Sequence, residues 1–350
     1  MTAPINTTLS DVFRSTPGGD PRSAIGDAFY GINQRQIPGA MPVNHDQHGL
    51  TFFTRPQLNL QTSNVLVSRT MVPLLTEESA SVQRMVRKAL DPRIDLACPI
   101  FDSRSAFIPV LSNLLLRLNG WPDPAVETYT SKPGMAGEEL SMVDGHIDNK
   151  SAYTLTATFR NVLGNPIGLI HDAWLEYASR VFIGQMLPYP DFIAMNEIDY
   201  NTRIYRLVLD RTRRFVQSIA CCGAAFPIST TTGQTFNYER DQPRNSSNDE
   251  MQISFRANGW YYNDYMAVMN FNNVVGVFNP DMREYRYKDA MVQIPHDLMD
   301  SFRSRGYPRI DPNTLELQWW VSQGEYSSRM AALDRHNQAL GTSLPYLQSQ

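Results

Sequence analysis

The sequence has few cysteines, no long apolar run and no targeting signal. Its three cysteines, Cys98, Cys221 and Cys222, are too few for a disulfide framework in 350 residues. Neighbouring cysteines in a strand point to opposite faces, so we expect reduced thiols that serve as small apolar side chains. The longest apolar run, 219–228, is too short for a membrane span, which needs about 20 residues. Residues 1–13 show no secretory signal.

Charge is also scarce and balanced. The net charge is −4, from 31 basic and 35 acidic residues, so the basic surplus of a dedicated duplex-DNA-binding protein is missing. Charged residues make up only 19% of the chain, against 16 Tyr, 16 Phe and 15 Met. Protein interfaces are rich in aromatic residues and Met and poor in Lys, Glu and Asp. The composition therefore favours a protein whose surface is covered by neighbouring proteins.

Motifs for catalysis, cofactor binding or metal binding are missing as well. The sequence has no glycine-rich phosphate loop, no GxGxxG before a helix and no GxSxG nucleophile motif. His45 and His48 are closely spaced, but no second pair of ligands accompanies them. We therefore predict that the chain is not an enzyme and has no catalytic residue, cofactor or metal.

Two segments show the alternation of half-buried strands, with every second residue apolar. They are 151–160 and 251–257, and each has one polar face. Those polar faces consist of Thr154, Thr156, Thr158 and Arg160 in the first segment and Gln252, Ser254 and Arg256 in the second.

Apolar residues also recur at helical spacing between Ile167 and Phe182, after the break Gly164-Asn165-Pro166. On this predicted helix Glu176 precedes Arg180 by four residues, an orientation that stabilises a helix by about 0.3–0.5 kcal/mol. The polar side of the helix has two interpretations, a structural surface or a subunit-contact face. Its residues are His171, Asp172, Glu176 and Arg180.

The rest of the chain is less regular. Residues 1–45, rich in Ser, Thr, Pro and Gly, are predicted to be a flexible arm. Thr76 is predicted to cap a helix that ends before Asp91. Further elements are expected as strands at Gly49–Leu60 and Leu315–Val321, helices at about Ala106–Leu118 and Glu325–Leu340, and a mobile loop at Ser131–Asp144.

Several sequence features occur in an order typical of one protein family. In chain order they are Phe52-Phe53-Thr54-Arg55-Pro56, Thr158-Phe159-Arg160, the helix with Trp174, Cys222-Gly223-Ala224-Ala225-Phe226-Pro227-Ile228, and Gln252–Phe255. In this order the chain resembles the tail-tube proteins of contractile-tailed bacteriophages, in particular the baseplate proteins that initiate the tube. The resemblance covers residues 48–60 and 150–262. A long insertion after the first strand and a long extension after the last depart from the family's pattern.

The resemblance implies an α+β fold, with an antiparallel β-sandwich or barrel of the tail-tube type and a packed central helix. A core at 46–262 would contain a helical insertion at 64–149, and a C-terminal extension at 263–350 would make inter-subunit contacts. The implied function is that of a non-enzymatic virion protein in a contractile tail. It would be made in the host cytoplasm and form a hexameric ring at the junction of baseplate and tube.

In such a ring one polar strand face lines the channel, and the candidate lumen-facing residues are Thr154, Thr156, Thr158, Gln252 and Ser254. The implied partners are other copies of the chain, tail tube and baseplate proteins, and viral DNA that passes without specific binding, but no membrane. Two alternatives remain. One is a baseplate cell-wall hydrolase or host-surface binding module with Glu138, Glu139, Asp144 or His146 in a cleft, and the other is a neck or capsid structural protein.

Overall fold

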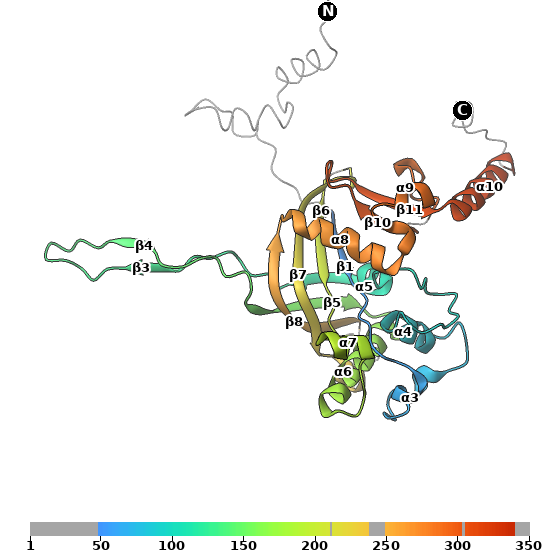
Figure 1. The fold of residues 1–350 in the computed structure, drawn as a ribbon, viewed down its shortest axis with the longest axis horizontal. Coiled ribbons are helices and arrows are strands. Elements are labelled where there is room, and N and C mark those ends of the chain that lie inside the picture. Colours follow the sequence, from blue (N-terminus) through green and yellow to red (C-terminus); the bar gives the residue numbers. More distant parts are fainter. Residues whose placement is uncertain (1–47, 211, 238–248, 303–304, 340–350) are drawn as a thin grey trace, which may run out of the picture. The chain divides into compact units, whose positions relative to one another are not determined.

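A six-stranded antiparallel sheet forms the centre of the computed structural model, which describes residues 48–210, 212–237, 249–302 and 305–339 (Figure 1). The strands follow the order β1-β6-β7-β8-β5-β2 across the sheet. The predicted flexible arm, 1–45, lies outside the described residues. The strands are β1 His48–Phe53, β6 Ile204–Leu209, β7 Val216–Ser229, β8 Glu250–Tyr262, β5 Ala152–Arg160 and β2 Leu115–Asn119.

The two edges of this sheet approach each other and nearly close it into a barrel. The amide of Ile108 donates to the carbonyl of Phe53 at 2.9 Å, and the amide of Arg55 donates to the carbonyl of Ala106 at 3.0 Å. From Ile108 the chain continues through α5 (Pro109–Leu114) into β2, the opposite edge strand. The predicted α+β fold is therefore present with a nearly closed, barrel-like antiparallel sheet.

The inner face of the sheet holds the first hydrophobic core, called the inner core below. Phe159 of β5 and Phe255 of β8 pack there with Trp174 of α6 (Pro166–Ile183). The Trp174 indole also donates its N–H to the carbonyl of Tyr200 at 2.8 Å. The helix predicted from apolar spacing is therefore present, and it covers the inner core.

The sequence break before α6 acts as its N-terminal cap. The side chain of Asn165 accepts a hydrogen bond from the amide of Gly168 at 3.2 Å, which satisfies one of the free amides of the first turn. At the other end Gly184 has a left-handed conformation, with φ of 77°, that terminates the helix.

A second helix contributes to the inner core, and its start differs from the prediction. This helix, α4 (Val82–Leu90), begins after Ser81, whose hydroxyl accepts a hydrogen bond from the amide of Arg84 at 3.2 Å. The prediction that Thr76 caps the helix was wrong. Thr76 instead ends a separate 3-10 turn, η1 (Val72–Leu75).

The outer face of the sheet is covered over β1, β6 and β7 by a second hydrophobic core, the outer core. Phe52 and Tyr205 pack there against Phe271 of α8 (Tyr265–Phe278). A three-stranded antiparallel sheet adjoins α8 and adds Trp320 to the same core (Figure 1). Its strands are β10 Tyr307–Ile310, β11 Leu317–Ser322 and β9 Met291–Gln293.

Two adjacent cysteines of β7 reach both cores. Cys221 lies in the outer core and Cys222 in the inner core, and both are buried free thiols. Burial raises the pKa of each thiol to about 12. This is the arrangement expected for small buried side chains in a strand.

Residues 106–148 differ most from the predicted structure. The expected helix at about Ala106–Leu118 is short, because α5 ends at Leu114 and the chain continues as β2. The loop expected at Ser131–Asp144 belongs to a two-stranded hairpin, formed by β3 (Thr128–Thr130) and β4 (Ser141–Val143). Figure 1 shows this hairpin extending away from the six-stranded sheet.

The remaining elements are short, apart from the last helix. The expected helix at Glu325–Leu340 corresponds to this helix, and the expected strand at Leu315–Val321 corresponds to β11. These remaining elements are α3 Thr62–Val65, α7 Pro190–Met195, η2 Thr232–Phe236, η4 Pro280–Met282, α9 Tyr287–Ala290, η5 His296–Leu298 and α10 Gln323–Ala339.

Candidate functional site

The polar strand faces predicted from alternation lie next to each other in the structure. β5 and β8 pair so that Thr156 is directly opposite Ser254 and Thr158 is directly opposite Gln252. Opposite residues of an antiparallel pair share one face of the sheet. Their apolar neighbours in sequence point into the inner core instead. The structure therefore brings the five candidate lumen residues together on the outer face of β5 and β8: Thr154, Thr156, Thr158, Gln252 and Ser254.

This outer face is polar, and its side chains are exposed or half-buried in the part of the chain that the structure describes. β2 extends it, because Arg117 pairs with Thr158 in the sheet. The outer core covers the same side of the sheet only over β1, β6 and β7. We call the uncovered part, over β2, β5 and β8, the open polar face.

Three arginines lie on the open polar face besides the predicted residues. Arg256 donates to the Thr154 hydroxyl at 3.3 Å, and Arg117 lies 4.0 Å from Glu250, with both of these charged side chains largely exposed. Arg160 is opposite Glu250 in the sheet. Three arginines and one glutamate leave two positive charges in excess. The alternation in the sequence already places Arg160 and Arg256 on the polar faces of their strands. Arg117 is assigned to the face only because the structure pairs β2 with β5.

The predicted subunit-contact residues on α6 separate into two groups. His171 is fully buried, and its ring lies between Phe159, Phe255 and Trp174 in the inner core. Its Nδ1 atom bonds the carbonyl of Ile167 at 2.8 Å, and burial lowers its pKa to about 4. His171 is therefore not part of a subunit-contact face, because a side chain inside the core cannot touch another subunit.

The other three residues of this group lie on the accessible side of α6. Glu176 and Arg180 form the expected ion pair at 2.8 Å. Ser68 also donates to Glu176 at 2.8 Å, and Thr232 donates to Asp172 at 2.8 Å. These contacts fix all three side chains against segments of their own chain and leave part of each exposed.

A cavity of about 580 Å³ lies beside this side of α6. Met71 and Leu74 line it from one side, and Leu169 and Ala173 line it from α6. Asp172 and Glu176 are also in its wall. The cavity combines an apolar floor with the carboxylates of Asp172 and Glu176, and side chains of the same chain already hydrogen-bond both of them.

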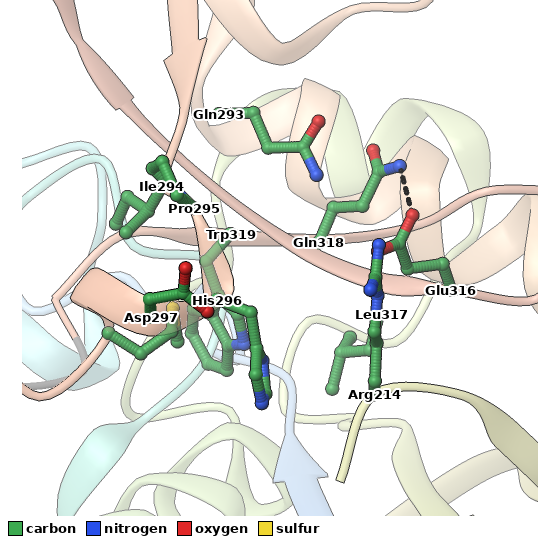
Figure 2. Close-up of a pocket in the computed structure, with 11 residues that line it drawn as sticks. Arg214, Gln293, Ile294, Pro295, His296, Asp297, Glu316, Leu317, Gln318 and Trp319 are labelled. Atoms are coloured by element: carbon green, nitrogen blue, oxygen red, sulfur yellow. Dashed lines mark hydrogen bonds and ion pairs between the residues drawn. The ribbon is translucent and has the colours of Figure 1, made fainter. Parts of the chain in front are cut away.

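A smaller cavity of about 260 Å³ lies where the β6–β7 turn approaches the three-stranded sheet (Figure 2). Gln293, His296 and Trp319 line it, together with Arg214 and Glu316. The last two side chains form an ion pair at 2.5 Å across one wall.

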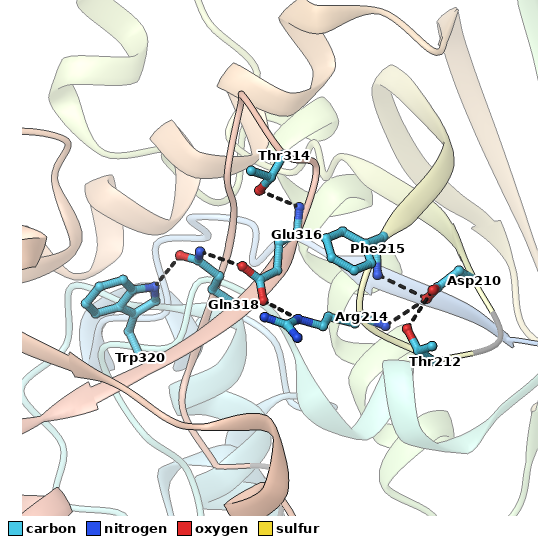
Figure 3. A network of polar contacts seen from close by, with 8 residues as sticks. All are labelled: Asp210, Thr212, Arg214, Phe215, Thr314, Glu316, Gln318 and Trp320. Carbon is cyan, nitrogen blue, oxygen red and sulfur yellow. Dashed lines mark hydrogen bonds and ion pairs between the residues drawn. The ribbon is translucent and has the colours of Figure 1, made fainter. Parts of the chain in front are cut away.

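Hydrogen bonds around that ion pair explain its position (Figure 3). Asp210 accepts from the backbone amide of Arg214 at 2.9 Å, which fixes the β6–β7 turn. Gln318 donates to Glu316 at 3.2 Å and accepts from the Trp320 indole at 3.3 Å. The network connects the turn to β11, so its polar groups have a structural role.

None of the residues of the hydrolase alternative lines either of these two cavities. Glu138, Glu139, Asp144 and His146 are all exposed and lie along the β3–β4 hairpin. Among the described residues, no group of three or more His, Cys, Asp or Glu side chains is placed to hold a metal ion. His45 lies outside the described residues. Within the described parts of the chain, no helix is both long and apolar enough to span a membrane.

One buried residue was not singled out from the sequence. Arg55 is almost fully buried between β1, α4 and the loop before α5. Its guanidinium donates to four backbone carbonyls, at 2.5 to 3.0 Å, and burial lowers its pKa to about 10. These carbonyls belong to Lys88, Ala89, Ser103 and Ser105. Arg55 thus holds the region where the sheet nearly closes.

Comparison with solved structures finds weak similarity to components of contractile injection systems. The anti-feeding prophage cap, a tube-terminating cap, is 15% identical, with 45% of this chain and 81% of that chain covered and a TM-score of 0.28. The sheath/tube terminator of the extracellular contractile injection system PVC is 12% identical, with 45% and 87% covered and a TM-score of 0.26. A chain of the PVC sheath-tube complex is 13% identical, with 45% and 82% covered and a TM-score of 0.25. No curated protein matches the chain.

Comparison with protein families gives a match that spans nearly the whole chain. The family is described as "Putative phage tail tube protein", and its model matches residues 7–337. The match includes the barrel-like sheet, the open polar face, the β3–β4 hairpin and nearly all of the C-terminal elements. The chain therefore belongs to this phage tail tube protein family.

Proposed function

We propose that the chain is a non-enzymatic structural subunit of a contractile phage tail, made in the host cytoplasm and incorporated into the virion. It forms a hexameric ring around a channel at the junction of baseplate and tube. Membership of a tail tube family over residues 7–337 supports the general assignment. The open polar face carries the more specific proposal, because it is the part of the sheet that the described segments leave uncovered.

The ring is built by placing sheets of neighbouring copies side by side. β2 pairs only with β5 among the described strands, so no other described strand covers its second edge. Exposed strand edges pair readily with another chain, and closing a ring removes them. The open polar face adjoins this edge and would form a continuous lining in the assembled ring.

The channel lining has the chemistry that passage of DNA requires. Thr154, Thr156, Thr158, Gln252 and Ser254 present hydroxyl and amide groups, which do not hold phosphates by releasing counterions. The three arginines of the face are the exception, because each could hold a phosphate by releasing counterions, although such a contact reads no sequence. The DNA is therefore passed without specific binding.

The surfaces away from the channel contact other tail tube and baseplate proteins. Asp172, Glu176 and Arg180 provide a polar contact face on α6 next to the cavity of about 580 Å³. The C-terminal extension, 263–350, provides further contacts through α8, α9 and the three-stranded sheet.

The first test is native mass spectrometry and negative-stain microscopy of the purified chain, alone and with its tail neighbours. Sixfold rings with an open channel are the expected result. A monomer under every condition, including with tail neighbours present, would contradict the proposed function.

The position of the open polar face is tested by labelling. In a Cys98→Ser background, Thr156→Cys is coupled to a maleimide gold cluster, and the assembled rings are imaged. We expect gold density in the channel. Glu197→Cys, at an exposed site between α7 and β6, is the matched control and should place gold outside the channel. Gold from Thr156→Cys at the outer rim would refute the lumen assignment but not the ring.

A further inference from the structure

The β3–β4 hairpin is the most exposed segment of the described chain. It connects β2 to β5 through residues 123–148, and only Ser131 is less than exposed. Its two strands pair with each other and with no other described strand. An isolated two-stranded hairpin is marginally stable in water unless it packs against something else. This segment therefore has the properties of a contact element that is completed by a partner.

One face of the hairpin is apolar. Tyr129 is directly opposite Met142, and both side chains are 51% exposed. Leu140 lies two residues before Met142, on the same face by the alternation of a strand, and is 61% exposed. On the other face the hydroxyls of Thr130 and Ser141 bond each other at 3.0 Å, and Val143, opposite Thr128 and 66% exposed, is the one large apolar side chain of the two strands there. The hairpin is thus amphipathic, and its apolar face is open to solvent in the single chain.

The hairpin also carries the acidic surplus of the protein. Residues 123–148 contain six carboxylates and one lysine, which gives a net charge of −5. The whole chain has a net charge of −4, so the remaining residues together carry +1. A partner surface for this hairpin should therefore combine apolar side chains with positive charge.

A surface of that kind lies around the end of α8 and the start of α9. Tyr285 is 75% exposed and Val277 is 64% exposed. Arg283 lies between them, donating to the carbonyl of Gly276 and to the Tyr285 hydroxyl, both at 3.4 Å. We call this surface the basic patch, and its residues are Arg104, Val277, Arg283, Tyr285, Arg286 and Lys288.

The charges of the basic patch are only partly neutralised. Asp281 pairs with Arg104 at 3.1 Å and with Arg286 at 3.2 Å, so one carboxylate serves two guanidinium groups. Counting Arg309, which pairs with Glu284, five basic side chains accompany three acidic ones, and two positive charges remain. The basic side chains are Arg104, Arg283, Arg286, Lys288 and Arg309, and the acidic ones are Asp281, Glu284 and Asp289.

We propose that the β3–β4 hairpin of one copy docks its apolar face on the basic patch of a second copy. The proposal rests on the proposed self-assembly and names the surfaces that carry it. Figure 1 shows the hairpin and α9 on opposite sides of the six-stranded sheet, so they do not meet within one chain. Contact between two different surfaces is head-to-tail, which propagates from copy to copy and closes into a ring or builds a stack.

Charge reversal tests this contact directly. Glu138→Lys with Glu139→Lys changes the hairpin, and Arg283→Glu with Arg286→Glu changes the patch. Each pair should weaken self-association about tenfold at low salt, because it puts like charges opposite each other. The chain that carries all four changes should recover wild-type association. The difference should fade at about 1 M salt, where the screening length is about 3 Å.

Glu77→Lys with Glu78→Lys is the matched control, since it also reverses two adjacent exposed glutamates and should leave association unchanged. Sedimentation velocity measures association, and thermal unfolding checks that each variant is folded. In the Cys98→Ser background, Tyr129→Cys and Tyr285→Cys should form a disulfide between copies when the two single variants are mixed.

Two outcomes separate this contact from the proposed function. Rings that form normally despite either reversal, or a four-change chain that does not recover, would overturn the docking contact and leave the ring intact. A chain that stays monomeric with its tail neighbours present would overturn both proposals. Recovery by the four-change chain together with the specific disulfide would establish the contact.

Discussion

Phe52 and Phe53 are adjacent in the chain and pack in different hydrophobic cores. The Phe53 ring lies 5.9 Å from the Phe255 ring in the inner core, and the Phe52 ring lies 5.3 Å from the Phe271 ring in the outer core. β1 is therefore buried on both faces. The helices α6 and α8 therefore contribute to different cores that meet at the same strand.

The first prediction follows from this arrangement. Phe52→Leu and Phe53→Leu should each lower the free energy of unfolding by about 1 to 2 kcal/mol. The effects should add to within about 0.5 kcal/mol, because the two rings pack in separate cores against different aromatic partners. Phe53→Leu and Phe255→Leu should instead be non-additive, since these rings touch. Urea unfolding measures all of these, and stronger coupling for the adjacent pair than for the touching pair would contradict the two-core arrangement.

The second prediction concerns Arg55, whose guanidinium satisfies four backbone carbonyls near the seam of the sheet. Arg55→Lys should lower the free energy of unfolding by about 2 to 4 kcal/mol, because one ammonium group cannot reach all four acceptors and stays buried. Arg117→Lys, at a largely exposed position, should change it by less than about 0.5 kcal/mol. Equal effects of the two substitutions in chemical denaturation would refute this role of Arg55.

The third prediction concerns acid stability. Burial lowers the pKa of His171 from 6.5 to about 4. The unfolded chain therefore binds more protons between these values, so the stability that neutral His171 provides is present above about pH 6.5 and is lost as the pH falls toward 4. His171→Phe does not titrate. Its stability relative to wild type should rise by roughly 2 to 3 kcal/mol between pH 7 and pH 4.

Urea unfolding of both proteins at a series of pH values provides the measurement. Asp91 and Asp199 have raised pKa values because of burial, and they act in the opposite direction, but they are present in both proteins. The comparison therefore isolates His171. A difference between the two proteins that does not change with pH would be evidence against a neutral buried imidazole.

The fourth prediction compares two glycines with positive φ at the hairpin. Gly120 has φ of 105°, and a Cβ there would lie 2.2 Å from the Thr154 carbonyl oxygen. Gly137 has φ of 80° and open space around it. Gly137→Ala should cost about 1 kcal/mol from backbone strain alone, whereas Gly120→Ala should cost at least about 2 kcal/mol more, because it also clashes with β5. Equal melting temperatures for the two variants would contradict the close approach of Gly120.

Local sequence patterns predicted the elements whose structure depends on local pairing or burial. Alternation located β5 and β8 and assigned Thr156 and Ser254 each to the polar face of its own strand, because the period of a strand is fixed by its geometry. That the two polar faces are one face of the sheet follows only from the pairing of the strands. Helical spacing located α6, because the period of a helix is likewise fixed by its geometry. The pattern did not show that His171 points inward, since a histidine on a helix next to charged residues has the same spacing whether it is buried or exposed.

Features that depend on long-range contacts were not predictable from the sequence. The approach of residues 106–108 to β1 joins segments about 50 residues apart, and nothing local to Ala106 signals it. Arg55 was likewise unremarkable in sequence, because its four acceptors are carbonyls that every residue has. The sequence does not predict the hairpin, because β3 and β4 are only three residues each, too short to show alternation.

The adjacent thiols of β7 allow the opening of each core to be followed separately. Cys221 is shielded by the outer core and Cys222 by the inner core, and neither thiol ionises readily while it is buried. Each therefore reacts with an alkylating reagent only when its own side of the strand is exposed. In a Cys98→Ser background, the order in which the two thiols become modified would reveal whether the C-terminal half detaches before the barrel opens or whether the chain unfolds as one cooperative unit.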